Sequence, residues 1–480
     1  MSLNSSADKS GFRLKAVSSL GLAIGIGRLA QAVAFFMMAQ ILEKEDMGTV
    51  ALLTIIFAGL FQLTNLGFDR YLVYAGGSEK EDMHAWINAI WTMQLIRGLL
   101  VITATLIFPF IIPGNWQLDI SLTQWLTIGL AVLLMSCANP GISIYERSGD
   151  FSYVARVRAW STLFGALTNI AVVLIWPSPW AYLAGQIATA FLFAGLSLHY
   201  TTVWPRLLFS RERFGQVLSY SKYLLAIAVF SYLSAQFQNY YVGAVFGSAT
   251  LGMYYTWYRL VNLPRELVTQ LQTQVLFAKA SDEARRGTSI MRTHLKGFTL
   301  LVLLLMPFHI FVWFHGDFLM RILGGEGWVE FWWAGKVMAA SSVAFFLSGT
   351  ISPFMLVHVP RVSSILRSLE AVATVILILL LGPIYGVSGV LYSVLAILVV
   401  ALLGRGVVLY TMLITIDRWV HARALIAVLG MSSLPFLAVE AGLPFLYEGV
   451  WEFIMAAGLY AAMSLALLYE LFRRRGLIFG

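Results

Sequence analysis

Long apolar runs recur along nearly the whole chain, and short polar segments separate them. A helix needs about 20 apolar residues to cross roughly 30 Å of hydrocarbon. No polar stretch is long enough to fold by itself, so we expect an all-α integral membrane protein. The runs predict about fourteen transmembrane helices, at 17–42, 48–75, 84–112, 124–145, 155–176, 180–201, 219–246, 250–277, 295–315, 331–356, 362–382, 386–414, 423–441 and 450–471.

The lysines and arginines between these runs set the orientation. With the N-terminus inside, the inside segments hold most of the 32 lysines and arginines, whereas the outside loops hold Lys44 and Arg321. This asymmetry follows the positive-inside rule. We therefore expect a multi-pass protein of the cytoplasmic (inner) membrane with both termini in the cytoplasm.

A weak internal repeat divides the chain. The segment QILEKEDMGTVALLT at 40–54 is similar to AVFGSATLGMYYTWY at 244–258, six spans later. Each segment has an apolar helix end, a short polar turn and a glycine that opens the next helix. Repeats of this kind commonly place a substrate site between halves, near the membrane midplane. We predict an N-terminal six-helix bundle at 1–215, a C-terminal six-helix bundle at 216–415, and two extra helices with a basic cytoplasmic tail at 416–480.

Composition and motifs narrow the function classes. Hydrophobic residues make up 59% of the chain and charged residues 12%, about half the charged share of a soluble domain. The net charge of +8 comes mainly from short segments between spans, so we expect no nucleic-acid partner. The one cysteine, Cys137, excludes a disulfide within the chain. Phosphate-binding loops, metal-binding histidine motifs and nucleophile motifs are missing, so we expect no cofactor, no metal and no enzymatic activity.

Charges inside the predicted spans are the most informative residues. An arginine at mid-span costs roughly 2.5–3.5 kcal/mol on insertion scales. Acidic groups in the spans are few, chiefly Asp69 and Glu266, so we expect pairing to leave arginines unneutralised. A hydrated cationic cavity explains these arginines better than interhelical hydrogen bonding, while Arg97 and Arg405 are equally compatible with snorkelling to a membrane face. The span arginines are Arg28, Arg97, Arg259, Arg265 and Arg405.

Polar residues at helical spacing accompany the arginines in spans one, two, seven and eight, which occupy matching positions in the two halves. Guanidinium groups bind phosphate bidentately and stay charged. The pattern therefore predicts a phosphate or diphosphate head group as cargo, with amides for sugar hydroxyls. The candidate substrate-binding residues are Arg28, Gln31, Gln62, Asn65, Gln236, Asn239, Arg259, Asn262 and Arg265.

Two further sets of side chains are open to alternative interpretations. Asp69 and Glu266 are candidates for ion coupling, but either could instead pair with a neighbouring arginine. Tyr254, Trp257 and Tyr258 offer stacking surfaces for sugars, but the alternative is a lipid-facing aromatic belt.

Five segments, in this order and spacing, carry a family resemblance: QILEKEDMGTVALL (40–53), NLGFDRYLVYAG (65–76), FGSATLGMYYTWYRLVNLPRELVTQLQTQVLFAKAS (246–281), ILGGEGWVEFWWAGKVMA (322–339) and GPIYGVSGVLYS (382–393). The chain resembles the oligosaccharide (Wzx-type) flippases of the multidrug/oligosaccharidyl-lipid/polysaccharide exporter superfamily. The resemblance implies two six-helix bundles that form a V around a central cavity, plus two C-terminal helices. It implies flipping of undecaprenyl-diphosphate-linked sugar units for capsule, O-antigen or exopolysaccharide assembly. The implied partners are this lipid-linked oligosaccharide, membrane lipids and other polysaccharide assembly proteins.

Two other function classes stay open on the sequence alone. A drug or cation antiporter of the same superfamily would need an acidic or aromatic cavity, whereas the spans here are rich in arginine. A membrane polysaccharide polymerase or ligase would need catalytic loops on the outside, and the outside loops here are short.

Overall fold

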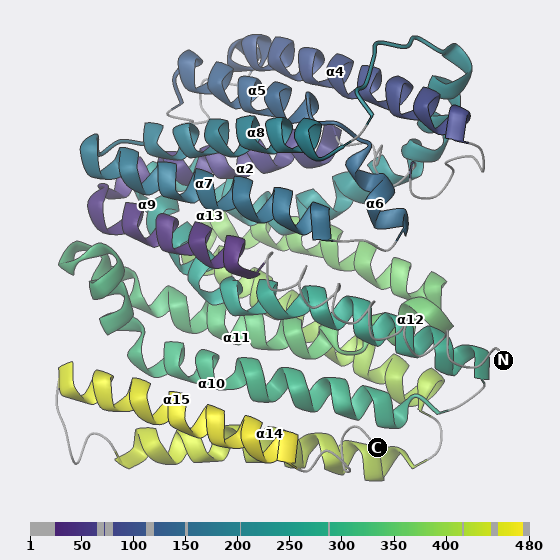
Figure 1. Cartoon of the computed structure of the whole chain (residues 1–480). Helices are drawn as coiled ribbons and strands as arrows, with labels where there is room; N and C mark the ends of the chain where they lie inside the picture. The colour runs from purple at the N-terminus through teal and green to yellow at the C-terminus, as the bar shows by residue number, and fades with distance from the viewer. Residues whose placement is uncertain are drawn as a thin grey trace. The chain divides into compact units, whose positions relative to one another are not determined.

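The computed structural model describes residues 25–64, 72, 80–111, 120–148, 152–201, 203–286, 289–414, 417–442 and 450–473. This part of the chain is helical, apart from short turns and the extended connection at 203–210 (Figure 1). It contains 8 helices long and apolar enough to cross a membrane, together with three shorter apolar helices. The all-α prediction is confirmed. Each predicted span overlaps a helix, but the count of fourteen stays a prediction because two pairs of predicted spans each run together in one kinked helix.

The first helix among the described residues is the apolar helix Gly25–Ile41. Helix α5 starts at a capping box: the Gln124 N–H donates to the Ser121 hydroxyl, and the Ser121 N–H donates to the Gln124 side chain. The helices that follow are α2 (Lys44–Thr64), α4 (Lys80–Ile111), α5 (Leu122–Ser136), α6 (Ile142–Ser148), α7 (Ser152–Ile175), α8 (Trp180–Tyr200) and α9 (Arg211–Arg286).

The second half continues from the long helix α9. Helix α13 begins with a proline in its first turn, where the missing N–H costs nothing, and it bends at Gly386, whose φ is 64°. The elements are α10 (Met291–Gly324), the 3₁₀ helix η1 (Glu326–Phe331), α11 (Trp332–Gly349), α12 (Ser352–His358), α13 (Pro360–Val408), the π-helical turn η2 (Leu409–Leu413), α14 (Arg418–Gly442) and α15 (Val450–Arg473).

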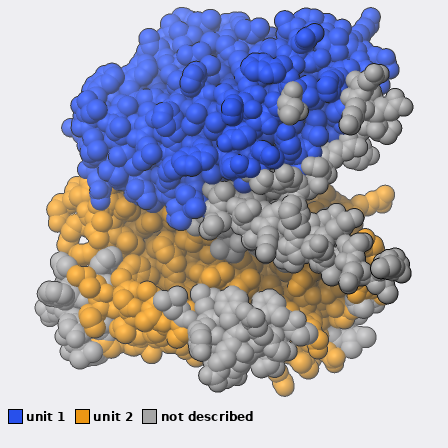
Figure 2. All heavy atoms as spheres, in the orientation of Figure 1, with its two compact units in different colours: residues 1–253 blue, residues 254–480 orange. Residues whose placement is uncertain are grey.

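The chain forms two compact units, Met1–Met253 and Tyr254–Gly480 (Figure 2). In the N-terminal unit, α7 packs on α8, and α5 packs on both α4 and α8 (Figure 1). In the C-terminal unit, α10 packs on α11, α14 and α15, while α11 packs on α13. The division at 1–215, 216–415 and 416–480 stays a prediction.

The two repeated turns meet inside the N-terminal unit. A side chain at Gly48 would overlap the carbonyl of Ser248, and a side chain at Gly252 would overlap the carbonyl of Lys44. Lys44 precedes Gly48 by the same interval as Ser248 precedes Gly252, so the contact is reciprocal, as between two copies of one motif related by a two-fold axis. Only glycine allows the backbones to approach this closely. The contact supports the internal repeat.

The fourth spanning helix of each predicted half stops early in the same way. Helix α5 is followed by α6, and α11 is followed by α12; both short helices have 7 residues. Pro140 lies in the first break and Pro353 in the first turn of α12. Proline removes a backbone donor and interrupts a helix. The repeat therefore extends from the turns to these helix breaks.

Large apolar side chains on the helix surfaces fit a lipid environment. Phe110 is 80% exposed, Ile175 is 84% exposed and Leu380 is 58% exposed. Soluble proteins rarely show large contiguous apolar patches, but hydrocarbon tails solvate such side chains at no cost.

Candidate functional site

The predicted site residues of the N-terminal unit lie in different surroundings. Arg28 and Gln62 are exposed, and Gln31 is half-buried. Asn239 is fully buried, and its Nδ2 donates to Oε1 of Gln236 over 2.8 Å. This bond lies within α9, while the buried Oδ1 of Asn239 has no hydrogen-bond partner among the described residues. Asn65 and the ion-coupling candidate Asp69 lie outside the described residues.

The predicted residues of the C-terminal unit follow one another on α9. Arg259, Arg265 and Glu266 are half-buried. Asn262 is 6% exposed, and its Nδ2 donates to the carbonyl of Tyr258 over 2.8 Å, so it bonds to its own helix. The backbone of α9 departs from helical geometry at Gly247, where φ is 84° and ψ is 172°. Pro264 lies within α9.

Arg265 is the predicted residue with the best-defined surroundings. Its guanidinium carbon lies 4.1 Å from the ring centroid of Phe345 on α11, and the group hydrogen-bonds to the side chain of Tyr258. A guanidinium group over an aromatic face gains roughly 0.5–2 kcal/mol, more when water is excluded. The ring therefore holds this charge in place within the helix bundle.

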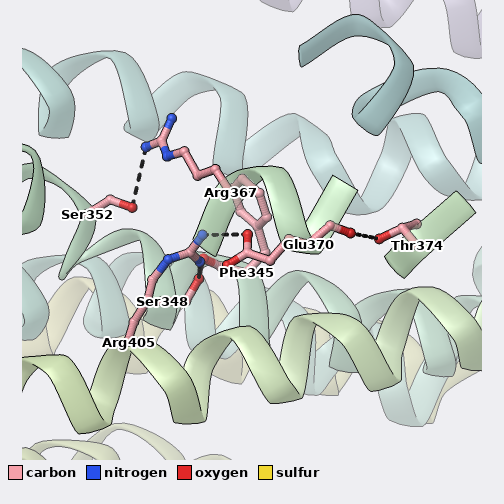
Figure 3. A network of polar contacts seen from close by, with 7 residues as sticks. All are labelled: Phe345, Ser348, Ser352, Arg367, Glu370, Thr374 and Arg405. Atoms are coloured by element: carbon pink, nitrogen blue, oxygen red, sulfur yellow. Dashed lines mark hydrogen bonds and ion pairs between the residues drawn. The ribbon is translucent and has the colours of Figure 1, made fainter. Parts of the chain in front are cut away.

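Two further arginines approach the same stretch of α11 and α12 (Figure 3). Nη1 of Arg405 donates to Oγ of Ser348 over 2.6 Å, and Nη2 donates to Oε2 of Glu370 over 2.5 Å. Nη2 of Arg367 donates to Oγ of Ser352 over 3.4 Å. We refer to Arg265, Arg367 and Arg405 as the arginine cluster.

The pairing of Arg405 corrects the expectation that Asp69 and Glu266 are the chief acidic partners in the spans. The side chains of Arg405 and Glu370 are 8% and 22% exposed and form a salt bridge. Both residues belong to α13, but on opposite sides of its bend at Gly386. Sequence spacing does not show that this bend brings them together.

The site has an excess of positive charge. The cluster brings three guanidinium groups together with the carboxylates of Glu266, beside Arg265, and of Glu370, bound to Arg405. Guanidinium groups are planar, remain charged and match the oxygens of a phosphate. The arrangement can hold an anionic group in a low-dielectric environment, where such attraction is strong.

Tyr254 and Trp257 do not provide the stacking surfaces considered from the sequence. Both are fully buried, and the indole N–H of Trp257 donates to the carbonyl of Phe331 over 3.1 Å. A side chain at Gly335 would meet the Trp257 ring. Tyr258 is half-buried and its ring stacks on Tyr255. Trp257 therefore packs η1 and α11 against α9.

Histidine pairings were invisible in the sequence motifs. Nε2 of His315 lies 3.0 Å from Oε1 of Glu440, and Nδ1 of His294 lies 3.2 Å from Nε2 of His421. All four side chains are buried. The pairs join residues 125 and 127 positions apart and tie α10 to α14 near both ends. They place the first of the two extra helices on the C-terminal unit.

Apolar helices of membrane-spanning length, which hold guanidinium groups between them, define a multi-pass membrane protein. The model of the polysaccharide biosynthesis protein family matches residues 37–332. The chain belongs to this family.

Relatives of known sequence agree with the assignment. The chain is 22% identical over 335 residues to the succinoglycan biosynthesis transport protein ExoT of Rhizobium meliloti (strain 1021), covering 66% of this chain and 64% of ExoT. It is 22% identical over 281 residues to an uncharacterized membrane protein in the cps region of Klebsiella pneumoniae, covering 56% of this chain and 55% of that protein. The matches thus span less than two thirds of either relative.

Solved structures show the same fold. The lipid II flippase MurJ in an inward closed conformation superposes with a TM-score of 0.73, at 14% identity, over 95% of this chain and 99% of that one. An inward-facing multidrug resistance transporter of the MATE family gives a TM-score of 0.60, at 14% identity, over 85% and 98%. ExoT, MurJ and the MATE protein are thus transporters or flippases by name.

Proposed function

We propose that this protein is a flippase that moves undecaprenyl-diphosphate-linked oligosaccharide units across the cytoplasmic membrane for capsule, O-antigen or exopolysaccharide assembly. The observation that carries the proposal is the arginine cluster, held on apolar helices of a polysaccharide biosynthesis family member. The named relatives support it, because ExoT is a succinoglycan transport protein and MurJ is a lipid II flippase.

The chemistry of the cluster suits a lipid diphosphate. A diphosphate cannot enter hydrocarbon without compensation, because an unpaired buried charge costs several kcal/mol or more. The cluster supplies that compensation, and the lipid tail stays among the exposed apolar side chains. In the predicted orientation, Ser348, Arg367 and Arg405 lie toward the cytoplasmic ends of their helices. A substrate made in the cytoplasm would then meet them first.

Transport requires the two halves of the repeat to exchange access between the two sides of the membrane. The sequence has no ATP-binding motif, so an ion gradient or consumption of the product outside would drive the cycle. Glu266 remains the described candidate for coupling to an ion. Arg28, Arg259 and Arg265 are the proposed contacts to the diphosphate, and both termini are proposed to lie in the cytoplasm.

A second candidate function is export of drugs or small cations. The likeness to the multidrug resistance transporter supports this alternative. The excess of guanidinium groups over carboxylates opposes it, because a cationic substrate would be repelled by the cluster.

Ligand-dependent stabilisation of the purified protein separates the two candidates. A ligand at 100 times its Kd raises the free energy of unfolding by about 2.7 kcal/mol. We expect a lipid-diphosphate oligosaccharide to stabilise the wild type, and the Arg265→Gln variant to lose much of this stabilisation. The cationic dye ethidium should have no effect. Stabilisation by ethidium but not by the lipid would favour the antiporter instead.

A further inference from the structure

Two histidines meet in the C-terminal unit where α10 and α14 begin. Nδ1 of His294 lies 3.2 Å from Nε2 of His421, and the two residues are 1% and 0% exposed. Each histidine lies in the first turn of its helix. The ring of His294 also packs against the rings of Phe298 on α10 and Phe354 on α12. The pair is therefore enclosed in a mainly apolar contact between three helices.

The hydrogen-bond partners fix which nitrogen of each imidazole carries a proton. Thr350 donates its one hydroxyl proton to the carbonyl of Leu347 over 2.7 Å, so toward Nε2 of His294, 3.2 Å away, it acts as an acceptor. A neutral imidazole has one donor and one acceptor nitrogen. Nδ1 of His294 therefore accepts from Nε2 of His421, and Nδ1 of His421 accepts from the hydroxyl of Tyr410 over 3.1 Å. One chain of hydrogen bonds joins η2, α14, α10 and the end of α11.

This chain of hydrogen bonds has no place for an additional proton. A proton on Nδ1 of His294 would set two N–H donors against each other. A proton on Nδ1 of His421 would make Tyr410 the acceptor, but it would leave a charged imidazole in a fully buried position. In the described part of the chain, neither imidazole bonds to a carboxylate, and burial of a charge without a partner is costly. The docked state of α14 therefore binds no additional proton.

The charges on the surrounding elements support this conclusion. The described carboxylates at this end belong to Glu283, which accepts from the hydroxyl of Thr293, to Glu370, which is bound to Arg405, and to the exposed Asp417. Nearby positive charges disfavour a further cation. The other described charged or titratable groups at this end are Lys279, Arg285 and Arg286 on α9, Arg292 and Lys296 on α10, His358 on α12, Arg361, Arg367 and Arg405 on α13, Tyr410 on η2, and Arg418 and Arg423 on α14.

Separation of α14 from α10 would open both imidazoles to water. They lie beside the exposed Arg292 and beside Trp419, which is 80% exposed, a combination typical of a membrane–water interface. A hydrated imidazole has a pKa of about 6.5, so it takes up a proton as the pH falls below this value. Because only the separated state binds these protons, acid favours separation. At pH 5.5 the factor is about tenfold for each histidine and about a hundredfold for both.

We propose that His294 and His421 form a proton-binding site, which fills when the start of α14 leaves α10. The ligand is the proton, and each imidazole takes one at its acceptor nitrogen. Docking of α14 and proton binding exclude each other. Thr350 lies two residues after Ser348, which accepts from Arg405, so the site reaches the helix break at the arginine cluster. The site rests on hydrogen-bond geometry and does not depend on the proposed function.

Hydrogen exchange of the full-length protein in nanodiscs tests the proposal, measured by mass spectrometry at pH 7.5 and 5.5. After correction for the intrinsic pH dependence of exchange, residues 418–425 should exchange about a hundredfold faster at pH 5.5. The other end of α14 is the internal reference. There His315 lies 3.0 Å from the carboxylate of Glu440, and a proton on this histidine strengthens the pair. Residues 436–442 should therefore not show the acceleration.

Three variants assign the response to the two histidines. Glutamine keeps one donor and one acceptor group in the side chain but does not titrate. The double variant His294→Gln/His421→Gln should therefore lose the acceleration, and His294→Gln alone should retain about tenfold. The matched control is His358→Gln, an exposed histidine at the end of α12, which should keep the full response.

The outcomes separate this site from the proposed function. Acceleration that is lost in the double variant and kept in His358→Gln supports the site. Exchange that ignores pH in the wild type, acceleration that persists in both histidine variants, or an equal rise at both ends of α14 overturns it. If the double variant does not fold, the smaller acceleration in His294→Gln decides. Flipping of the lipid with pH-independent exchange removes the site and keeps the flippase, whereas pH-dependent exchange without flipping does the reverse.

Discussion

Replacing Glu370 by alanine should destabilise the protein strongly, because it leaves Arg405 without its acidic partner. The guanidinium group is 8% exposed, and Ser348 would be its remaining partner among the described contacts. Removing one member of a buried ion pair typically costs 3–5 kcal/mol. Glu370 itself is 22% exposed, so water can partly replace it. We therefore expect a loss of about 3 kcal/mol, at the lower end of this range.

Reversible unfolding in mixed micelles measures this loss, and a double-mutant cycle assigns it to the pair. Arg405→Met combined with Glu370→Ala should cost less than the sum of the single changes, since the second change removes the unpaired charge. The matched control is Glu326→Ala, which breaks the exposed pair with Arg321, whose side chains are 77% and 48% exposed. An exposed pair contributes less than about 1 kcal/mol. Equal costs for both acidic residues, or full additivity in the cycle, would refute the reasoning.

Two further predictions concern packing. Gly48→Val should lower the free energy of unfolding by at least about 1–3 kcal/mol, because the new side chain meets the carbonyl of Ser248. Gly195→Val is the control and should be close to neutral in packing, since nothing lies within 4 Å of a side chain there. Equal losses of stability for the two variants in denaturation experiments would contradict the reciprocal contact. Trp257→Phe should cost about 1 kcal/mol, through the lost hydrogen bond to Phe331, and leave flipping per folded molecule unchanged. A large loss of flipping at unchanged stability would instead give Trp257 a role in substrate binding.

The fold class was predictable because an apolar run of about 20 residues is by itself long enough to cross the membrane as a helix. A spanning helix satisfies its backbone internally, so the runs alone predict helices without knowledge of their neighbours. The repeat was also visible, because Gly48 and Gly252 stand in similar turns and their close contact requires glycine in both. The number of spans was harder to predict, since Gly247 in α9 and Gly386 in α13 each join two predicted spans into one kinked helix.

The site was less predictable because its partners come from distant parts of the chain. The ion pair of Glu370 and Arg405 depends on a bend in α13, and no spacing rule contains that bend. Asn262 fails for a different reason: it lies on the predicted polar stripe, but its amide donates to the carbonyl of Tyr258 on its own helix. A periodic pattern gives the face of a helix but not the bond that each side chain makes.

A cavity in the N-terminal unit, lined by Arg97 and Arg158 among other residues, shows a further limit of sequence reasoning. Gln94 and Arg97 are three residues apart on one predicted span, which marks a polar face. Arg158 lies near the start of the predicted span 155–176, and no spacing rule places it beside Arg97, with which it lines the same cavity. Pro140 and Pro353 were both present in the sequence, but only the structure shows that they lie at matching breaks, after α5 and at the start of α12.

The central claim is tested most directly by flipping in liposomes. Purified protein would be reconstituted with a fluorescent undecaprenyl-diphosphate oligosaccharide, and a membrane-impermeant quencher would report its arrival in the outer leaflet. The account predicts that wild type flips the lipid faster than protein-free liposomes and that Arg265→Gln slows it by at least about tenfold, while Arg285→Gln, exposed in the last turn of α9, does not. A wild-type rate equal to that of protein-free liposomes would contradict the account.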